Sequence, residues 1–417
     1  MFSASETEQI LNNLSDTFIA LSEQTKSRAL FLNELDEFKE GDLAPNGKPY
    51  RTFNKSEIYE KLNLRQGSSK LDSLVKKLTL NTSTGRAWRV NLLDRILLQR
   101  AIGDFPKFER SKHQSMITYV IGNLKGGAGK TTCTATLATG IASEATKEYR
   151  IGVIDLDPQG TCTRILLPKM SPDQLSVGDL LIEEDLELDV GETLQQAVQS
   201  TFCKTNYPNL KILPASEEDT RFELYSKMKG IEAAKAGQVY TSSLHLSKIL
   251  DAVRDDFDIL FIDTPPHMNE INIAAHYVAN RLIIPLKATE NDRDSTGKYL
   301  KQLTQFYTYM KELGHKGYDS INILPSAVNT RSSTEVRIAN SIKQALGSYV
   351  LDMTTYSEPV VNTNEDLSTI FDISGSFYSG KNTSLYAAQS VMMPLISSIE
   401  AQANEFWRSQ EKMNGDS

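Results

Sequence analysis

The sequence predicts an α/β fold with a mostly parallel sheet and helices on both of its faces, preceded by an N-terminal helix and a small basic domain. Three observations indicate this fold. A glycine-rich loop joins a strand to a helix, two later apolar strands end in aspartate, and strand and helix alternate from there onward. Parallel strands joined by helices bring their carboxyl ends to one edge, where such sheets bind ligands.

The glycine-rich loop is the most informative stretch. Residues 116–121 predict a strand, residues 132–145 predict a helix, and between them stands Lys125-Gly126-Gly127-Ala128-Gly129-Lys130-Thr131-Thr132. Glycines let the backbone approach phosphate oxygens, and a helix N-terminus favours an anion. Lys130 is expected to reach the β- and γ-phosphates, and the Thr131 hydroxyl to ligate Mg²⁺. A chance glycine loop would not account for the strand and helix on its two sides, so we expect a P-loop NTPase domain that binds ATP or ADP.

Charge and cysteine content limit the possible partners and compartment. From residue 51 to residue 112, fourteen lysines and arginines stand against six aspartates and glutamates, a net charge of +8, although the whole chain carries −8. A basic module on an acidic body favours a polyanionic partner. Cys133, Cys162 and Cys203 are far apart and fit neither a disulfide framework nor a zinc site, which indicates a reducing cytoplasm. No apolar run approaches the roughly 20 residues of a membrane span.

The first 48 residues predict a helix followed by a linker. Apolar residues recur at helical spacing between residues 4 and 40, and glycine, proline and aspartate follow in residues 41–49. We expect the apolar stripe to pack on the next domain or on a second copy of the chain.

Residues 49–112 predict a winged helix-turn-helix domain. A first helix over residues 53–64 has Asn54 or Ser56 as its cap, and a second over residues 70–78 has Ser68 or Ser69. Residues 80–90 predict a β-hairpin wing. The candidate DNA contacts here are Lys70, Lys76, Lys77 and Arg86. A small helical bundle with a solvated basic face is the alternative.

Residues 113–417 predict the nucleotide-binding body. Strands are expected at residues 151–154, 211–213, 258–262, 281–285 and 320–328, and a last long helix at residues 383–407. The strand at 151–154 leads into Asp155 and Asp157, and the strand at 258–262 leads into Asp263. Carboxylates at these strand ends face the ligand site of a parallel sheet, so Asp263 is expected to hold Mg²⁺ beside Thr131.

Three motifs in this order resemble ParA, the partition ATPase, within the ParA/MinD class. They are K-G-G-A-G-K-T-T, D-L-D-P-Q-G from residue 155, and F-I-D-T-P-P from residue 261. In the first, Leu124 replaces the opening glycine of an ordinary P-loop and Lys125 precedes the glycines, which is the deviant form of that class. The resemblance covers residues 116–399. The N-terminal part resembles the larger ParA subclass, with a dimerisation helix and a winged DNA-binding domain.

The resemblance implies roles for individual residues. Lys125 corresponds to the lysine that crosses a homodimer interface to the partner's nucleotide, and Asp157 to the carboxylate that orients the attacking water and lies near the metal. Asp263 belongs to the second switch. Asn329 stands where relatives contact adenine. The nucleotide contacts implied by the loop are Gly126, Gly127, Ala128, Gly129, Lys130, Thr131 and Thr132, and the candidate non-specific DNA contacts are Arg331, Arg337, Lys343 and Lys381.

The resemblance also implies partners and a location. It implies slow ATP hydrolysis accelerated by a ParB-like centromere-binding protein, binding to nucleoid DNA in the cytoplasm, and repression of the partition operon through an operator. A nucleotide-switched transcriptional repressor remains an alternative. A MinD-like membrane ATPase is less favoured because residues 399–417 are acidic and weakly apolar, and an iron–sulfur reductase because no suitably spaced cysteine pair is present.

Overall fold

The computed structural model describes residues 13, 15–17, 43–84, 87–182, 186, 191–355, 358–375 and 377–415. The predicted N-terminal helix therefore lies almost wholly outside the described residues, and Arg86 lies outside them as well.

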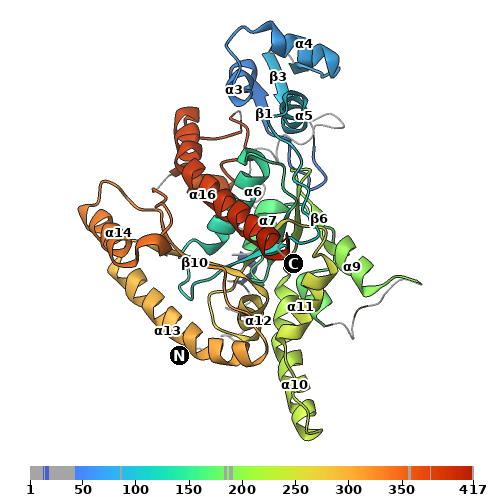
Figure 1. Ribbon diagram of the computed structural model, residues 1–417, viewed down its shortest axis with the longest axis vertical. Helices are drawn as coiled ribbons and strands as arrows, with labels where there is room; N and C mark the ends of the chain where they lie inside the picture. The colour runs from blue at the N-terminus through green and yellow to red at the C-terminus, as the bar shows by residue number, and fades with distance from the viewer. Residues whose placement is uncertain are drawn as a thin grey trace.

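The body is built on a seven-stranded sheet, and the predicted mostly parallel sheet is confirmed (Figure 1). All neighbouring strands pair in parallel except the last pair, β6 and β7, which is antiparallel. In spatial order the strands are β10 (Ser320–Ser326), β9 (Arg281–Lys287), β4 (Ile117–Ile121), β8 (Ile259–Asp263), β5 (Ile151–Asp155), β7 (Leu210–Leu213) and β6 (Cys203–Lys204). The strand that precedes the glycine loop, β4, is thus an interior strand, next to the central strand β8.

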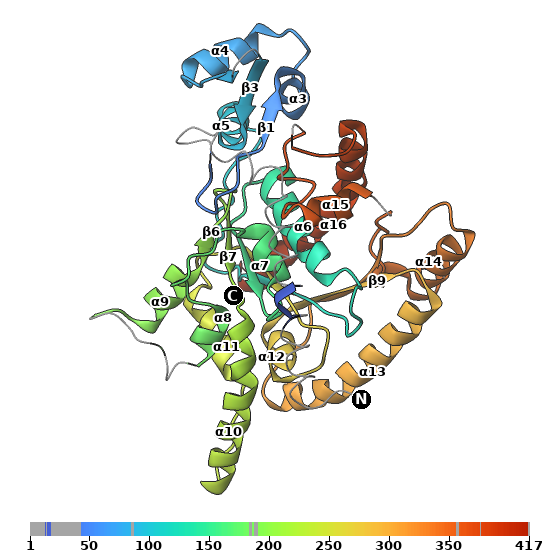
Figure 2. The same cartoon turned by 180° about the vertical axis from the view of Figure 1, so that it is seen from behind.

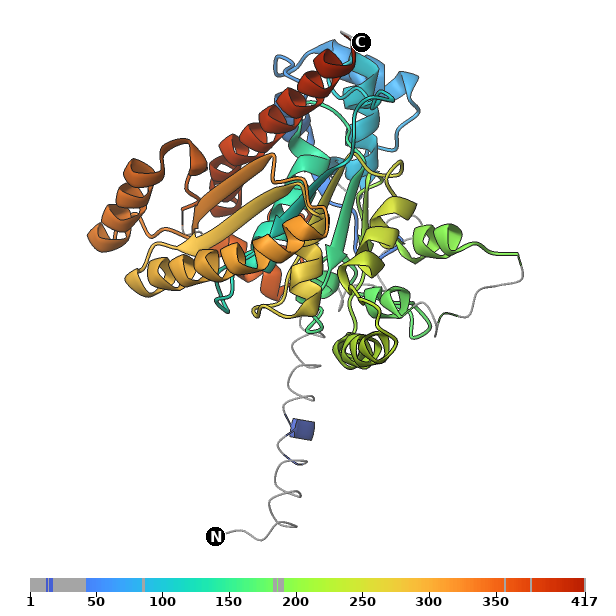
Figure 3. The same cartoon turned by 60° about the horizontal axis from the view of Figure 1, so that its bottom comes forward.

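Each face of the sheet has its own hydrophobic core, because successive side chains of a strand point to opposite faces. In β4, Tyr119 and Ile121 belong to one core and Val120 to the other. Figure 3 shows the red α16 on one side of the strands and the orange α13 on the other. The first core is covered by α6 (Lys130–Glu144), α7 (Thr161–Leu166) and α16 (Asn382–Gly415), and the second by α8 (Val177–Leu181), α9 (Leu194–Thr201), α11 (Ser243–Ala252), α12 (Glu270–Val278), α13 (Glu290–Glu312) and α14 (Ser333–Leu346). Helices α10 (Arg221–Lys235) and α15 (Glu358–Glu365) and two 3₁₀ turns, Glu217–Thr220 and Gly347–Tyr349, complete the body.

Residues 43–112, which we call the N-terminal module, form a separate three-stranded antiparallel sheet of order β1-β3-β2 with three helices. Asn54 caps the first helix in a capping box with Glu57, and Ser68 caps the second. The third helix was not predicted, although Asn91 caps it and apolar residues follow. The elements are β1 (Thr52–Asn54), α3 (Lys55–Lys61), α4 (Ser69–Lys77), β2 (Ser83–Thr84), β3 (Ala87–Asn91) and α5 (Leu92–Ile102).

The N-terminal module is packed onto the body. Phe53 and Leu98 of the module belong to the same hydrophobic core as Tyr149 and Trp407 of the body. Figure 2 shows the module, in blue, above the end of α6. Because the two parts share one core, removing the module would expose apolar surface of the body to water.

The last helix is longer than predicted, ending at Gly415 and not near Trp407. Its apolar residues Ile399, Ala403 and Trp407 are buried, and Trp407 Nε1 donates to the carbonyl oxygen of Ser115 at 2.9 Å. Among the described residues, no helix combines the length and apolar character needed to cross a bilayer.

Candidate active site

The glycine loop leaves β4 at the carboxyl edge of the sheet and ends at the first residue of α6. Gly127 and Gly129 have φ angles of 75° and 91°, a left-handed conformation that a side chain would oppose. A Cβ atom added to Gly126 or Gly127 would meet no other atom within 4 Å. No side chain caps α6, whose N-cap is Gly129. The first N–H groups of this helix can therefore receive an anion.

Lys130 is buried at the start of α6. Burial lowers the pKa of its ammonium, and the negative charges of Asp263 and Asp157 act in the opposite direction. A desolvated cation beside an anion-binding helix end is suited to bind a polyphosphate. The negative charge of the phosphates would compensate for the hydration that the Lys130 ammonium loses on burial.

The Thr131 hydroxyl donates to Asp263 Oδ2 at 2.7 Å, and the Thr134 hydroxyl donates to Oδ1 at 3.3 Å. These oxygens are the ligands that Mg²⁺ prefers. The described residues contain no group of three or more His, Cys, Asp or Glu side chains placed to hold a metal. The Thr131 hydroxyl and the Asp263 carboxylate fit a Mg²⁺ ion, whose other ligands would be phosphate oxygens and water.

Asp155 and Asp263 end the paired strands β5 and β8, directly opposite each other, and both are fully buried. Burial raises the pKa of both carboxyls; the charge of Asp155 raises that of Asp263 further, and the charge of Asp157 raises that of Asp155. Asp155 Oδ2 accepts two hydrogen bonds of 2.8 Å from the backbone N–H and hydroxyl of Thr163, and Oδ1 accepts the Asp157 N–H at 3.1 Å. Asp155 thus holds the turn that carries Asp157.

Asp157 is only partly buried, unlike Asp155 and Asp263. Its Oδ1 accepts the N–H of Gln159 at 3.1 Å, and the turn closes at Gly160, whose φ is 59°. Asp157 therefore lies at the surface of the site near Lys130, where its carboxylate can meet a water molecule.

Lys125 forms an ion pair within its own chain, an interaction that sequence reasoning missed. Its Nζ lies 2.6 Å from Asp292 Oδ2, near the start of α13, and the Asp292 side chain is only 4% exposed. The same face of α13 carries Thr296, which bonds the Asn123 amide at 3.1 Å. Asp292 is 167 positions from Lys125, so no local pattern could have revealed the pair.

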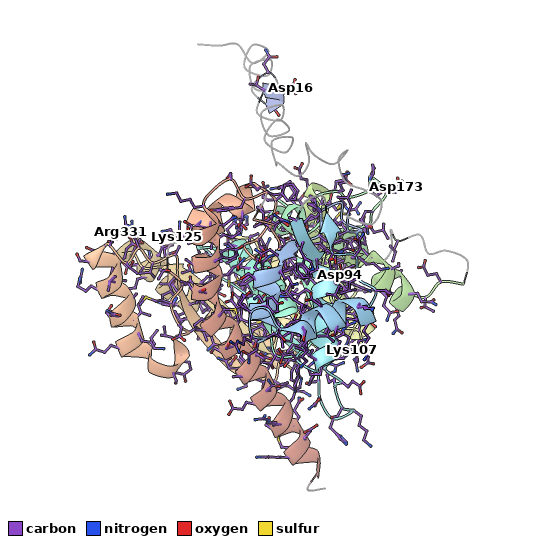
Figure 4. The ribbon with its side chains drawn as sticks, turned by 90° about the horizontal axis from the view of Figure 1, so that it is seen from above. Asp16, Asp94, Lys107, Lys125, Asp173 and Arg331 are labelled. Carbon is purple, nitrogen blue, oxygen red and sulfur yellow. The ribbon has the colours of Figure 1, made fainter. Side chains whose placement is uncertain are left out.

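Asn329 lies just beyond β10, on the side of the sheet that carries the loop. Ser326, at the end of β10, donates its hydroxyl to the Ala128 carbonyl oxygen at 3.3 Å. Asn329 is exposed, and its Oδ1 accepts the Arg331 N–H at 3.0 Å. Figure 4 labels Arg331 and Lys125 on the same side of the molecule, away from Lys107 of the N-terminal module.

The candidate DNA contacts form two separate groups. Lys70, Lys76 and Lys77 are exposed on α4, in the N-terminal module. Arg331, Arg337, Lys343 and Lys381 are exposed on the body, and Lys343 also donates to the Val350 carbonyl oxygen at 2.6 Å. Lys343 is therefore partly used within the chain.

The cysteines are not arranged for redox or metal chemistry in the described part of the chain. All three are free thiols, and Cys133 and Cys162 are buried. Burial raises the pKa of the Cys133 thiol to about 12 and that of Cys203 to about 11. Protonated thiols are poor nucleophiles and poor metal ligands.

Comparison with known proteins gives relatives over the body. Residues 116–316 match the family model described as an AAA domain. A protein of Sinorhizobium fredii, provisionally named replication protein A, is 27% identical over 301 residues, 69% of each chain. The chromosome partitioning protein ParA of Caulobacter vibrioides is 29% identical over 169 residues, so this chain is matched over 40% of its length and spans about half (54%) of that protein. A solved structure named Partition Protein shares the fold, with a TM-score of 0.58 at 20% identity over 85% of this chain and 95% of that one.

Proposed function

From the premise that this chain belongs to the ParA-type partition ATPases, we propose that it is a slow, Mg²⁺-dependent ATP hydrolase that moves replicated DNA. The observation that carries the proposal is the convergence of Lys130, Thr131, Asp157 and Asp263 at one edge of the sheet. These side chains and the open glycine loop provide a phosphate grip, metal ligands and a partly exposed carboxylate.

The proposed chemistry is positioning and charge stabilisation, without a covalent intermediate. Lys130 and the first N–H groups of α6 bind the β- and γ-phosphates, and Asn329 contacts adenine. Thr131 and Asp263 would hold Mg²⁺, which when bound neutralises charge that develops on the phosphates. Asp157 orients the attacking water. A lone carboxylate is a weak base for water, which is why we propose slow turnover that a ParB-like partner accelerates.

The proposed DNA cycle depends on a homodimer. Lys125 would leave Asp292 and reach the nucleotide of a second copy, so ATP would favour the dimer. The dimer would bind nucleoid DNA through Arg331, Arg337, Lys343 and Lys381, whose exposure supports this role. Hydrolysis would remove the interactions with the γ-phosphate, and the protein would then release the DNA.

The N-terminal module would bind an operator and repress the partition operon. The exposed Lys70, Lys76 and Lys77 on α4 support this second activity. Replacing all three by alanine is expected to weaken operator binding, by about 1–3 kcal/mol for each of these side chains that reads a base. A truncation would be a poorer test, because the module shares its core with the body.

The experiment that tests the proposal uses the full chain with Asp157→Ala. This variant should bind ATP and DNA but fail to hydrolyse ATP, and so remain on DNA, because only the water-orienting group is removed. Nucleotide binding, phosphate release and DNA retention at low salt are measured, with Asp173→Ala, an exposed carboxylate, as the matched control. Loss of ATP binding by Asp157→Ala would contradict the role proposed for Asp157.

The second candidate is a transcriptional repressor whose ATPase acts only as a switch. The hydrophobic core that the module and the body share favours this second candidate, because a change of the nucleotide bound to the body can alter the packing of the module. The rate of ATP hydrolysis separates the two candidate functions. A partition ATPase is accelerated by DNA together with a ParB-like protein, and a pure switch is not.

A further inference from the structure

A short segment that begins in the last turn of α15 touches both the phosphate loop and the N-terminal module. We call residues 363–374 the strap. At its first end, Asn364 Nδ2 donates to the hydroxyl of Thr132, the last residue of the loop motif, at 2.9 Å. The other polar atom of this amide, Asn364 Oδ1, is buried and has no hydrogen-bond partner in the part of the chain that the structure describes. A buried carbonyl oxygen without a partner is costly, and beside a ligand site it indicates a bond made when the ligand is present.

The middle of the strap follows α6 and borders the turn that carries Asp157. The hydroxyls of Thr369 and Thr139 lie 2.9 Å apart, and both residues are buried. Leu367 lines a cleft of about 310 Å³ together with Pro158 and Gly160 of that turn. Leu367 has a φ of 54°, a conformation that leucine rarely adopts unless its surroundings impose it.

The far end of the strap is anchored in the N-terminal module. Asp372 Oδ2 lies 2.7 Å from Lys48 Nζ, and the two side chains are 0% and 2% exposed. Arg51 donates to the Phe371 carbonyl oxygen at 3.0 Å, and the Thr52 N–H donates to the Ser374 hydroxyl at 2.9 Å. Because these bonds join the strap directly to the module, a movement at Asn364 would be passed on to the residues that lead into β1.

We propose that Asn364 contacts the bound nucleotide and that the strap transmits this contact to the N-terminal module. Its Oδ1 would accept a hydrogen bond from a ribose hydroxyl, while Nδ2 could move from Thr132 to an α-phosphate oxygen. The inference rests on the proposed function, since it requires ATP at the glycine loop. It assigns a residue and a route that neither the glycine motif nor the aspartate motifs contain.

A second route must be separated from the strap. Helix α6 itself runs from Lys130 at the nucleotide site to Glu144, which pairs with Arg95 of the module. Asn364→Ala keeps every residue of α6 and its pair with the module at Glu144, and removes only the side chain that the strap presents to the site, with its bond to Thr132. Asn364 is partly exposed, so the substitution should not prevent folding.

The test measures amide hydrogen exchange by mass spectrometry on the full chain, with and without ATP and Mg²⁺, together with the affinity for a fluorescent ATP analogue. In the unmodified chain, ATP should slow exchange at residues 48–54 and 369–374. Asn364→Ala should bind the analogue about 3- to 10-fold more weakly, which is the effect of removing one hydrogen bond. When this variant is saturated with ATP, amide exchange at residues 48–54 should no longer be slowed. Asn340→Ala, an exposed asparagine on α14, should behave as the unmodified chain.

Thr369→Val provides an independent variant, because valine keeps the shape of threonine and removes the hydroxyl, which bonds Thr139 at 2.9 Å and, at 3.3 Å, Asp372 Oδ1 and the Phe371 N–H within the strap. It should bind the analogue normally and show a reduced change at residues 48–54. If ATP binds and exchange at residues 48–54 does not change, or if Asn364→Ala keeps the full change, the strap inference is overturned and the proposed function stands. If the unmodified chain does not bind ATP, both fail together.

Discussion

The two ends of α6 differ in how much of their chemistry is used within the chain. At the N-terminal end, the helix has no side-chain cap, and Gly126 and Gly127 before it border open space. At the C-terminal end, Glu144 is buried and pairs with both Lys61 and Arg95 of the N-terminal module. One 15-residue helix, about 22 Å long, therefore carries an open end and a closed end.

The two ends of α6 therefore have different roles: the open end can bind a ligand, and the closed end joins the N-terminal module to the body. A buried charge must be paired, and where the chain supplies every partner the charge holds the structure together. Where the chain leaves a buried cation such as Lys130 beside an uncapped helix end, the missing partner is expected to be a ligand.

The largest effect is expected at the closed end. Glu144→Ala would leave Arg95, whose side chain is 0% exposed, without its carboxylate. The free energy of unfolding in urea should fall by about 3–5 kcal/mol. Glu148→Ala is the matched control, since its partner Arg100 is 34% exposed and can be hydrated, so the loss should be smaller. Equal losses in the two variants would contradict the contrast.

At the open end, Lys130→Ala should reduce phosphate release by on the order of 10²–10³, or about 2.7–4 kcal/mol, because the phosphates lose a preorganised cation. Stability should change little in comparison with Glu144→Ala. Lys301→Ala, an exposed lysine on α13, is the control. Turnover that survives in Lys130→Ala would overturn the assignment of the nucleotide site.

A buried histidine, His276, leads to a prediction about how the free energy of unfolding depends on pH. His276 is buried between the hydroxyls of Tyr299 and Tyr318, at 3.0 and 2.9 Å. Burial lowers its pKa to about 3. In the unfolded chain a histidine titrates near 6.5, so below that pH the unfolded state gains a proton that the folded state refuses. Stability from this group is complete above pH 6.5 and falls as the pH drops towards 3.

The expected size is about 2 kcal/mol between pH 7 and pH 5. Urea unfolding is measured at both pH values. In His276→Gln, whose amide can still donate and accept hydrogen bonds, the free energy of unfolding should fall between pH 7 and pH 5 without this contribution. An unchanged pH dependence in the variant would mean that His276 does not titrate in this way.

The smallest effect is expected at Lys125. Asp292→Asn removes the carboxylate that holds the Lys125 ammonium within the chain. If Lys125 must leave to reach a second copy, ATP-dependent dimerisation should occur at roughly two- to fivefold lower protein concentration. Light scattering measures this, and Asp294→Asn, an exposed carboxylate paired with Arg293, is the control. Weaker dimerisation of Asp292→Asn would argue against a release of Lys125.

The sequence by itself determined the nucleotide-binding architecture. The glycine loop, the strand that precedes it and the aspartates that end later strands are local patterns, and their order along the chain predicted the parallel sheet that the structure has. The caps were readable to within two candidates each, because a cap acts on N–H groups two or three residues away, and the structure selects Asn54 over Ser56 and Ser68 over Ser69.

Only the tertiary structure decided which distant residues complete these elements. Lys125 meets Asp292, Glu144 meets Lys61 and Arg95, and Asn364 meets Thr132 across 232 positions. Residue periodicity records which face of a helix or strand is apolar, but it does not record which other face will cover it. These pairings follow from how the two cores close on the sheet, and they exist only once the whole chain has packed.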